Sequence, residues 1–153
     1  MSQAPLNAVV PLPEQTYAKE GYTHSLDISY LDFALNTTVS TAVTILVAAT
    51  ALGDQVGPVG YQLITPFQDS GDPNFNTFGV TAGNTAGVSN LMVSKETNAN
   101  GSYISAWASN LIVAPVGADT FNLVFTPTSG KAPSTLDTGL FRFFFKLPKL
   151  PIT

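Results

Sequence analysis

Five side chains that carry oxygen ligands fall within eight residues of the segment DSGDPNFN: Asp69, Ser70, Asp72, Asn74 and Asn76. Hard cations such as Ca²⁺ bind several oxygens, so this segment is the best candidate metal site in the chain. It does not have EF-hand spacing, because the third, fifth and twelfth positions from Asp69 hold Gly, Pro and Val. Asp and Asn also bond their own backbone in tight turns. We therefore predict a self-bonded surface turn and no metal site.

Residues of the kinds used in catalysis are sparse. The chain has no cysteine and one histidine, His24, which has no G-x-S-x-G context. Its position beside Tyr22, at the start of a predicted strand, favours an edge or interface histidine. Asp27 and Asp32 are five residues apart, which on an extended strand places them on opposite faces. We predict no catalytic residue, no cofactor and no enzymatic activity.

Two aromatic residues suggest an alternative chemistry. Tyr103 and Trp107 share one face of a predicted strand, and such a pair could form a platform on which a sugar ring stacks. Aromatic residues at this spacing more often belong to one core face, which is the favoured interpretation. A carbohydrate-binding module for host adhesion is the alternative.

The composition indicates a surface of neutral polar groups. Charged residues make up 10% of the chain, against about 25% in typical globular domains. Neutral polar groups cost less to bury than charges, which suits assembly with other protein. No Lys/Arg cluster precedes residue 131, so we expect no nucleic-acid partner. The longest apolar run, 41–52, is too short and too Thr-rich to span a bilayer, so we expect no membrane partner.

From His24 onward, β-branched and aromatic residues recur with a period of two between Gly, Pro, Asn and Asp clusters, which predicts an all-β body. The predicted strands are 24–31, 38–48, 58–67, 77–82, 89–94, 102–113 with a break at Ser109–Asn110, 120–126 and 139–147. They indicate a single antiparallel β-sandwich, jelly-roll-like, with an immunoglobulin-like arrangement as the second choice. Three parts are expected: an extended, Pro-rich N-terminal arm over 1–23, the sandwich over 24–147 and a C-terminal tail over 148–153.

Alternation also predicts the core. The inward residues are expected to be Val39, Val43, Ile45 and Val47; Tyr61, Leu63 and Phe67; Phe121, Leu123 and Phe125; and Phe141, Phe143, Phe145 and Leu147.

The last strand presents aromatic rings to both faces, because Phe143, Phe144 and Phe145 are consecutive. Arg142 and Lys146 share the face of Phe144 and make it amphipathic. Either this face is covered within the domain or it meets a neighbouring subunit, and an interface is the favoured explanation. The candidate interface residues are Leu6, Val9, Val10, Leu12, Arg142, Phe144, Lys146, Leu147 and Leu150.

One long stretch resembles a known pattern. The sequence LITPFQDSGDPNFNTFGVTAGN, followed shortly by ETNANGSYISA, is similar to small structural proteins of tailed bacteriophages. In these, an aromatic strand end leads into an acidic loop, then F-N-T and a strand that ends in Gly. The resemblance spans about residues 25–105 and includes neither the N-terminal arm nor the Phe-rich strand.

The resemblance implies a capsid decoration or cement protein, often a β-sandwich homotrimer, on the exterior of a phage head assembled in the host cytoplasm. Its partners would be the major capsid protein and its own copies. A tail or head-fibre component is the close alternative.

Overall fold

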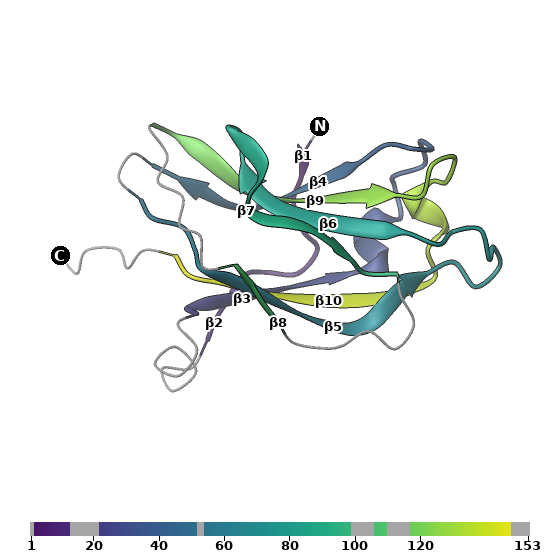
Figure 1. Cartoon of the computed structure of the whole chain (residues 1–153), viewed down its shortest axis with the longest axis horizontal. Helices are drawn as coiled ribbons and strands as arrows, with labels where there is room; N and C mark the ends of the chain where they lie inside the picture. Colours follow the sequence, from purple (N-terminus) through teal and green to yellow (C-terminus); the bar gives the residue numbers. More distant parts are fainter. Residues whose placement is uncertain (1, 13–21, 52–53, 99–105, 110–116, 148–153) are drawn as a thin grey trace.

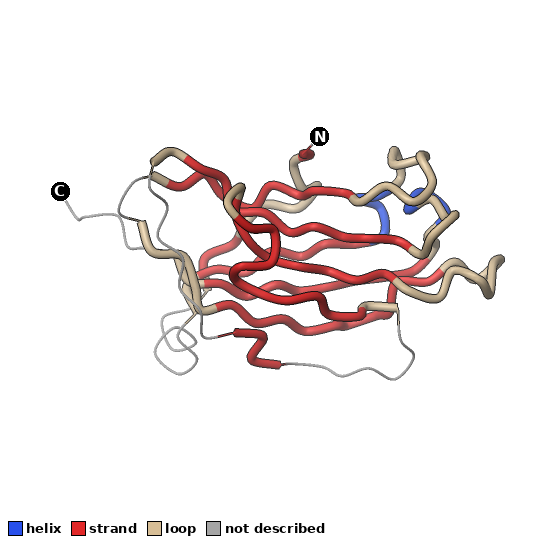
Figure 2. The backbone as a smooth tube through the Cα atoms, turned by 45° about the horizontal axis from the view of Figure 1, so that its top comes forward, coloured by secondary structure: helices blue, strands red, loops and turns tan. Residues whose placement is uncertain are grey.

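The computed structural model describes residues 2–12, 22–51, 54–98, 106–109 and 117–147. These residues form two five-stranded sheets packed face to face as a β-sandwich (Figures 1 and 2). The strands are β1 (Ser2–Gln3), β2 (Val10–Pro11), β3 (His24–Ser29), β4 (Val43–Thr50), β5 (Val59–Gln68), β6 (Phe78–Asn84), β7 (Gly87–Glu96), β8 (Ala106–Ser109), β9 (Asp119–Pro127) and β10 (Thr138–Phe145). Two short 3-10 helices, η1 (Tyr30–Phe33) and η2 (Pro133–Thr135), lie at one end of the sandwich.

The sheets have the strand orders β1-β4-β9-β6-β7 and β2-β3-β10-β5-β8. Strands β3 to β10 pair as nested partners: β3 with β10, β4 with β9, β5 with β8 and β6 with β7, all antiparallel. This nesting is compatible with the predicted jelly roll. The all-β sandwich predicted from the sequence is confirmed, and each of the eight predicted strands has a counterpart among β3 to β10.

Aromatic rings fill the space between the sheets. Phe33, Phe67, Phe78 and Phe125 are fully buried and meet at centroid distances of 5.0–5.9 Å. Each buried Phe side chain stabilises the fold by roughly 1.5–3 kcal/mol. Gly139 makes room for this cluster, because a Cβ at this position would lie 2.1 Å from Phe67 Cδ1 and φ is +145°. The core is therefore one aromatic layer shared by both sheets.

Several expected strand boundaries were wrong by two residues or more. The strand expected over 24–31 ends at Ser29, where the chain turns into η1. The strand expected over 38–48 starts at Val43, and Val39 is 55% exposed instead of in the core. The reason is non-local: Ser40 N–H donates to the Lys131 carbonyl, which holds the segment before β4 against the β9–β10 connection.

Most of the other residues predicted for the core are buried. Leu147 is only partly buried, although it packs against the core cluster, whereas every other predicted core residue apart from Val39 is buried. Within the strand expected over 102–113, only β8 is described; it ends at Ser109, next to the predicted break. The C-terminal tail at 148–153 lies outside the described residues.

Candidate interaction surface

The outer face of the sheet β2-β3-β10 carries a groove of about 360 Å³. It lies between the N-terminal segment and the two strands β3 and β10. The lining residues are Asn7, Ala8, Val10, Leu12, Ser25, Asp27, Arg142 and Phe144. The structure thus brings together four of the predicted interface residues, Val10, Leu12, Arg142 and Phe144, which come from two segments more than a hundred residues apart.

Strand alternation places this groove outside the core. Phe141, Phe143 and Phe145 point inward and are fully buried, whereas Arg142 and Phe144 point outward and are partly exposed. The prediction that the Phe143–Phe145 run faces both sides of the strand is confirmed.

Arg142 and Asp27 form a two-point ion pair within the groove. They are Cα partners in the β3–β10 ladder. Arg142 Nε donates to Asp27 Oδ1 at 2.8 Å, and Arg142 Nη2 donates to Asp27 Oδ2 at 2.9 Å. The hydrogen bond to Asp27 raises the pKa of the Arg142 guanidinium, so the arginine stays charged. The two hydrogen bonds therefore hold both side chains in place, and their opposite charges leave this part of the groove nearly neutral.

Phe144 forms the aromatic wall of the groove and is itself partly covered. The Tyr22 ring stacks on it at a centroid distance of 5.7 Å and an interplanar angle of 23°, and Tyr22 is only 4% exposed. The sequence left two explanations for the outward Phe144 ring: cover within the domain or contact with a neighbouring subunit. Tyr22 covers part of the ring within the domain. The uncovered part of the ring faces the groove.

The other predicted interface residues are dispersed. Leu6 is 68% exposed, and Lys146 is exposed just beyond β10. Val9 and Leu147 are partly buried and pack against the core cluster, so much of each side chain already contacts its own domain. Leu150 lies outside the described residues.

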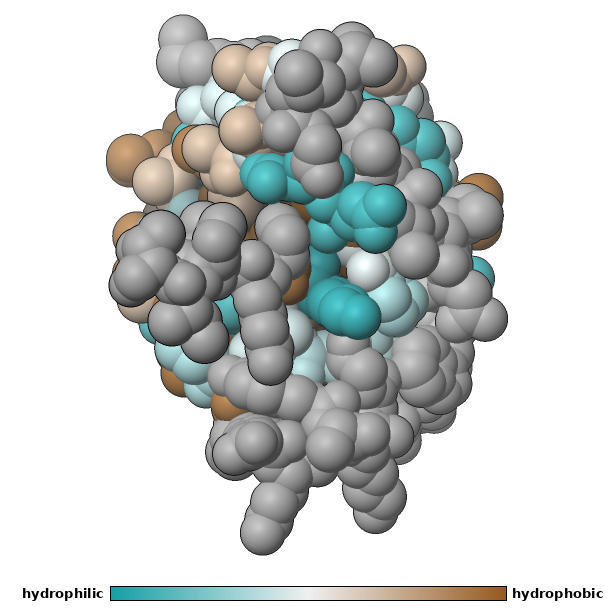
Figure 3. All heavy atoms as spheres, turned by 90° about the vertical axis from the view of Figure 1, so that its left-hand side faces the viewer, coloured by the Kyte–Doolittle hydropathy of each residue, from teal (hydrophilic) through white to brown (hydrophobic). Residues whose placement is uncertain are grey.

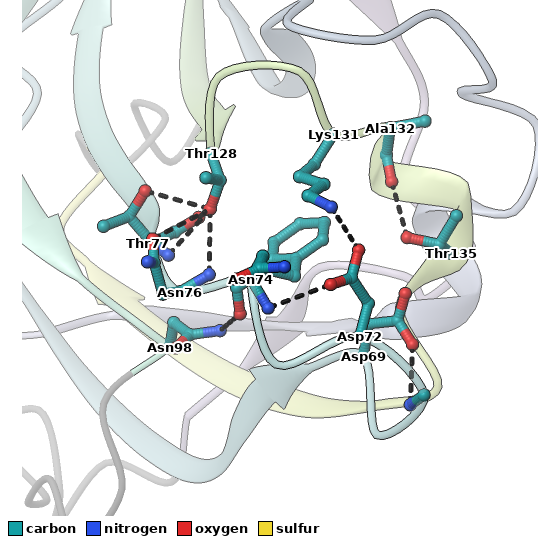
Figure 4. Close-up of polar contacts among 12 residues, drawn as sticks. Asp69, Asp72, Asn74, Asn76, Thr77, Asn98, Thr128, Lys131, Ala132 and Thr135 are labelled. Atoms are coloured by element: carbon teal, nitrogen blue, oxygen red, sulfur yellow. Dashed lines mark hydrogen bonds and ion pairs between the residues drawn. The ribbon is translucent and has the colours of Figure 1, made fainter.

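The segment that could have bound a metal is a self-bonded turn (Figure 4). Asp69 Oδ1 accepts from Gly71 N–H at 3.0 Å, and Asp72 Oδ1 accepts from Asn74 N–H at 2.9 Å. The other Asp72 oxygen forms an ion pair with Lys131, and this contact lowers the pKa of the Asp72 carboxyl. The predicted turn is confirmed. Within the described ranges, no three His, Cys, Asp or Glu side chains gather closely enough to hold a metal ion.

Further hydrogen bonds tie this turn to neighbouring loops at the same end of the sandwich. Thr128 Oγ1 accepts from the backbone N–H groups of Asn76 and Thr77 at 3.0 and 2.8 Å. The Asn98 amide donates to the Phe67 and Phe75 carbonyls at 2.7 and 3.1 Å. The side chains of Thr128 and Asn98 thus brace the acidic loop, which is the β5–β6 connection.

His24 lies at the first position of β3, as predicted. Its Nδ1 is 2.7 Å from Thr23 Oγ1, and its ring stacks on Phe145 at 5.9 Å. Burial lowers the pKa of the imidazole. These contacts place the ring against the end of the aromatic layer.

The explanation for the separation of Asp27 and Asp32 was wrong, because β3 ends between them. Asp32 lies in η1 and is 5% exposed, and its Oδ2 accepts from Ser29 N–H at 2.9 Å. Its importance was missed from the sequence. The spacing Ser29-x-x-Asp32 is the available signal, because an acidic residue three positions after a serine is typical of a capping box.

Tyr103 lies outside the described residues, and Trp107 is described only as part of the backbone of β8.

One end of the sandwich, where β4 and β10 finish, has a mixed surface. In Figure 3 the described hydrophilic residues gather in a central band, with apolar residues toward one side. In the part of the chain that the structure describes, no helix is long and apolar enough to cross a membrane.

Comparison of the chain with protein families, with characterised proteins and with solved structures found no match.

Proposed function

We propose that this protein is a virion structural protein that decorates the exterior of a bacteriophage head and binds the major capsid protein as a homotrimer. The observation that carries the proposal is the groove on the outer face of β2-β3-β10. It combines apolar walls, a charge pair that is nearly neutral overall and exposed apolar residues of the N-terminal segment. A surface of this kind suits contact with protein, since interfaces combine apolar cores with few unpaired charges.

The bacteriophage assignment is supported by the resemblance of residues 25–105 to small phage structural proteins. The nested strand order agrees with it by analogy, because viral capsid domains use jelly rolls. Lectins and cupins use the same fold, so the fold alone assigns no function. Repetition of one modest contact by three subunits would give firm attachment to a shell.

The test is binding of the purified protein to phage heads that lack it. Light scattering after size exclusion is expected to give a trimer, and co-sedimentation is expected to show saturable binding to the heads. Val10→Asp should abolish co-sedimentation, because it places a charge on an apolar wall of the groove. Val88→Asp is the matched control, because Val88 on β7 is 58% exposed and Val10 is 53% exposed. Equal binding of the two variants to the heads would contradict the role of the groove as the surface that contacts the capsid.

Labelling on intact virions separates the head from the tail. Signal spread over the head is the expected result. Signal confined to the tail or to the vertices would instead assign the protein to a tail or head fibre.

A further inference from the structure

The N-terminal segment 2–12 adds one short strand to each sheet. β1 pairs in parallel with β4, with Ser2 opposite Thr44 and Gln3 opposite Ile45. β2 pairs antiparallel with β3, with Val10 opposite Ser25. Figure 1 shows the consequence: the segment passes from the upper sheet at β1 to the lower sheet at β2. Eleven residues thus cover the β4 edge of one sheet and the β3 edge of the other.

The body of the sandwich supplies a preformed acceptor for this segment. The Asp32 carboxylate is buried and is oriented through Oδ2 by Ser29 N–H. Its Oδ1 accepts from Leu6 N–H at 2.8 Å, and the Asp32 carbonyl accepts from Gln3 Nε2 at 2.6 Å. Without the segment, the Asp32 Oδ1 atom would lose its backbone donor, the Leu6 N–H. The body therefore offers the N-terminal segment two acceptors at Asp32.

The segment contributes little apolar burial in return. None of residues 2–12 is buried, and the side chains of Leu6 and Val10 are 68% and 53% exposed. Hydrogen bonds hold it instead, including Asn7 Nδ2 to the Asp27 carbonyl at 2.9 Å and Leu12 N–H to the Thr23 carbonyl at 2.9 Å. The contacts fix its register, while the side chains of Leu6 and Val10 stay exposed.

We infer that the β3 and β4 edges, with Asp32, are a docking site for the N-terminal segment of a second copy of this chain, and that neighbouring copies exchange these segments. The second copy is the occupant because its residues 2–12 reproduce every contact seen within one chain. Exchange of an identical element between copies is a low-cost route to an oligomer. It also brings Leu6 and Val10, which are exposed within one chain, close to a second body.

The chain length allows the exchange. Nine residues, 13–21, separate the segment from the described start of the body at Tyr22. A fully extended chain of nine residues spans up to about 30 Å, a distance comparable to the diameter of a small domain.

This inference extends the homotrimer of the proposed function, but it is tested without phage heads. If segments exchange and the protein does not bind heads, the decoration function fails and the exchange stands. If the protein binds heads and no exchange occurs, the exchange fails and the decoration function stands.

The experiment uses the absence of cysteine from the chain. Full-length Ser2→Cys and full-length Thr44→Cys, distinguished by tags, are co-expressed, purified and oxidised with copper–phenanthroline. Each chain then has one thiol, so a disulfide between the two variants forms when the segment of one chain pairs with β4 of the other. The expected result is a heterodimer on non-reducing gels, with the Ser2→Cys to Thr44→Cys peptide identified by mass spectrometry.

Two controls make every outcome decisive. The double variant Ser2→Cys/Thr44→Cys establishes that the two positions can cross-link, because they are Cα partners across β1 and β4. Co-expressed Thr44→Cys and Val124→Cys should give no heterodimer above random collision, because this β4–β9 pair lies within one body. A double variant that closes only within its own chain, together with no heterodimer above this background, would overturn the exchange. Failure of the double variant to cross-link would also overturn it, because the docking site would not hold β1 as described.

Discussion

Arg142 on β10 and Asp27 on β3 face each other across the ladder and are joined by two hydrogen bonds of 2.8 and 2.9 Å. The pair lies on the outer face of the sheet, beside the outward ring of Phe144. It therefore shapes the groove that the candidate interface residues line.

We expect the ion pair to add little stability. The side chains of Arg142 and Asp27 are 40% and 31% exposed, and exposed pairs contribute at most about 1 kcal/mol. A double-mutant cycle with Arg142→Gln and Asp27→Asn, measured by urea unfolding, should give a coupling free energy below about 1 kcal/mol. A coupling of several kcal/mol would mean that the pair is a structural element and not a feature of the groove.

Phe143 and Phe144 provide a matched comparison of the two faces of β10. Phe143 is fully buried against Phe121, Phe141 and Phe145, so Phe143→Ala should lower the free energy of unfolding by about 3–5 kcal/mol. Phe144→Ala should cost clearly less, because the ring is partly exposed and the variant mainly loses its stacking on Tyr22. Urea or thermal unfolding of both variants measures the difference. Equal losses would contradict the assignment of faces.

Asp32 is expected to control attachment of the N-terminal segment. Asp32→Ala removes the acceptor of both Ser29 N–H and Leu6 N–H, so the free energy of unfolding should fall by about 1–3 kcal/mol. Hydrogen exchange at the Leu6 amide should become much faster. Asp27→Ala is the control, because Asn7 bonds the Asp27 carbonyl and not its side chain. Unchanged protection of Leu6 in Asp32→Ala would contradict the anchoring role.

Acid is expected to weaken the loops that three carboxylates brace. The pKa of Asp72 is lowered mainly by its hydrogen bond to Lys131, that of Asp119 by Thr85 and that of Asp137 by Ser70. A pKa that is lower in the folded state means that the folded protein binds fewer protons. The resulting stability is therefore complete above the unfolded pKa, at about pH 4, and is lost as the pH falls through the lowered values.

Unfolding midpoints measured from neutral pH to below about pH 4 test this expectation. Asp72→Asn and Asp137→Asn should flatten the fall at acid pH. A midpoint that rises on acidification would contradict the sign of the effect.

The sequence by itself determined the local structure. Alternation located eight strands and most of the core, because a period of two is built into the backbone of any strand. The Asp69–Asn76 turn was equally predictable, since the Asp69 and Asp72 side chains bond backbone groups only two residues away. The two faces of the Phe143–Phe145 run follow from the same local rule.

Only the tertiary structure decided which segments meet. Val39 left the expected core because Ser40 bonds Lys131, a residue far along the chain, and no local pattern contains that contact. The groove, the pairing of residues 2–12 with both sheets and the burial of Asp32 depend equally on strand order and register. Strand order and register are set by packing of the aromatic layer between the two sheets. The periodicity of side chains along one strand does not specify which strand lies next to it.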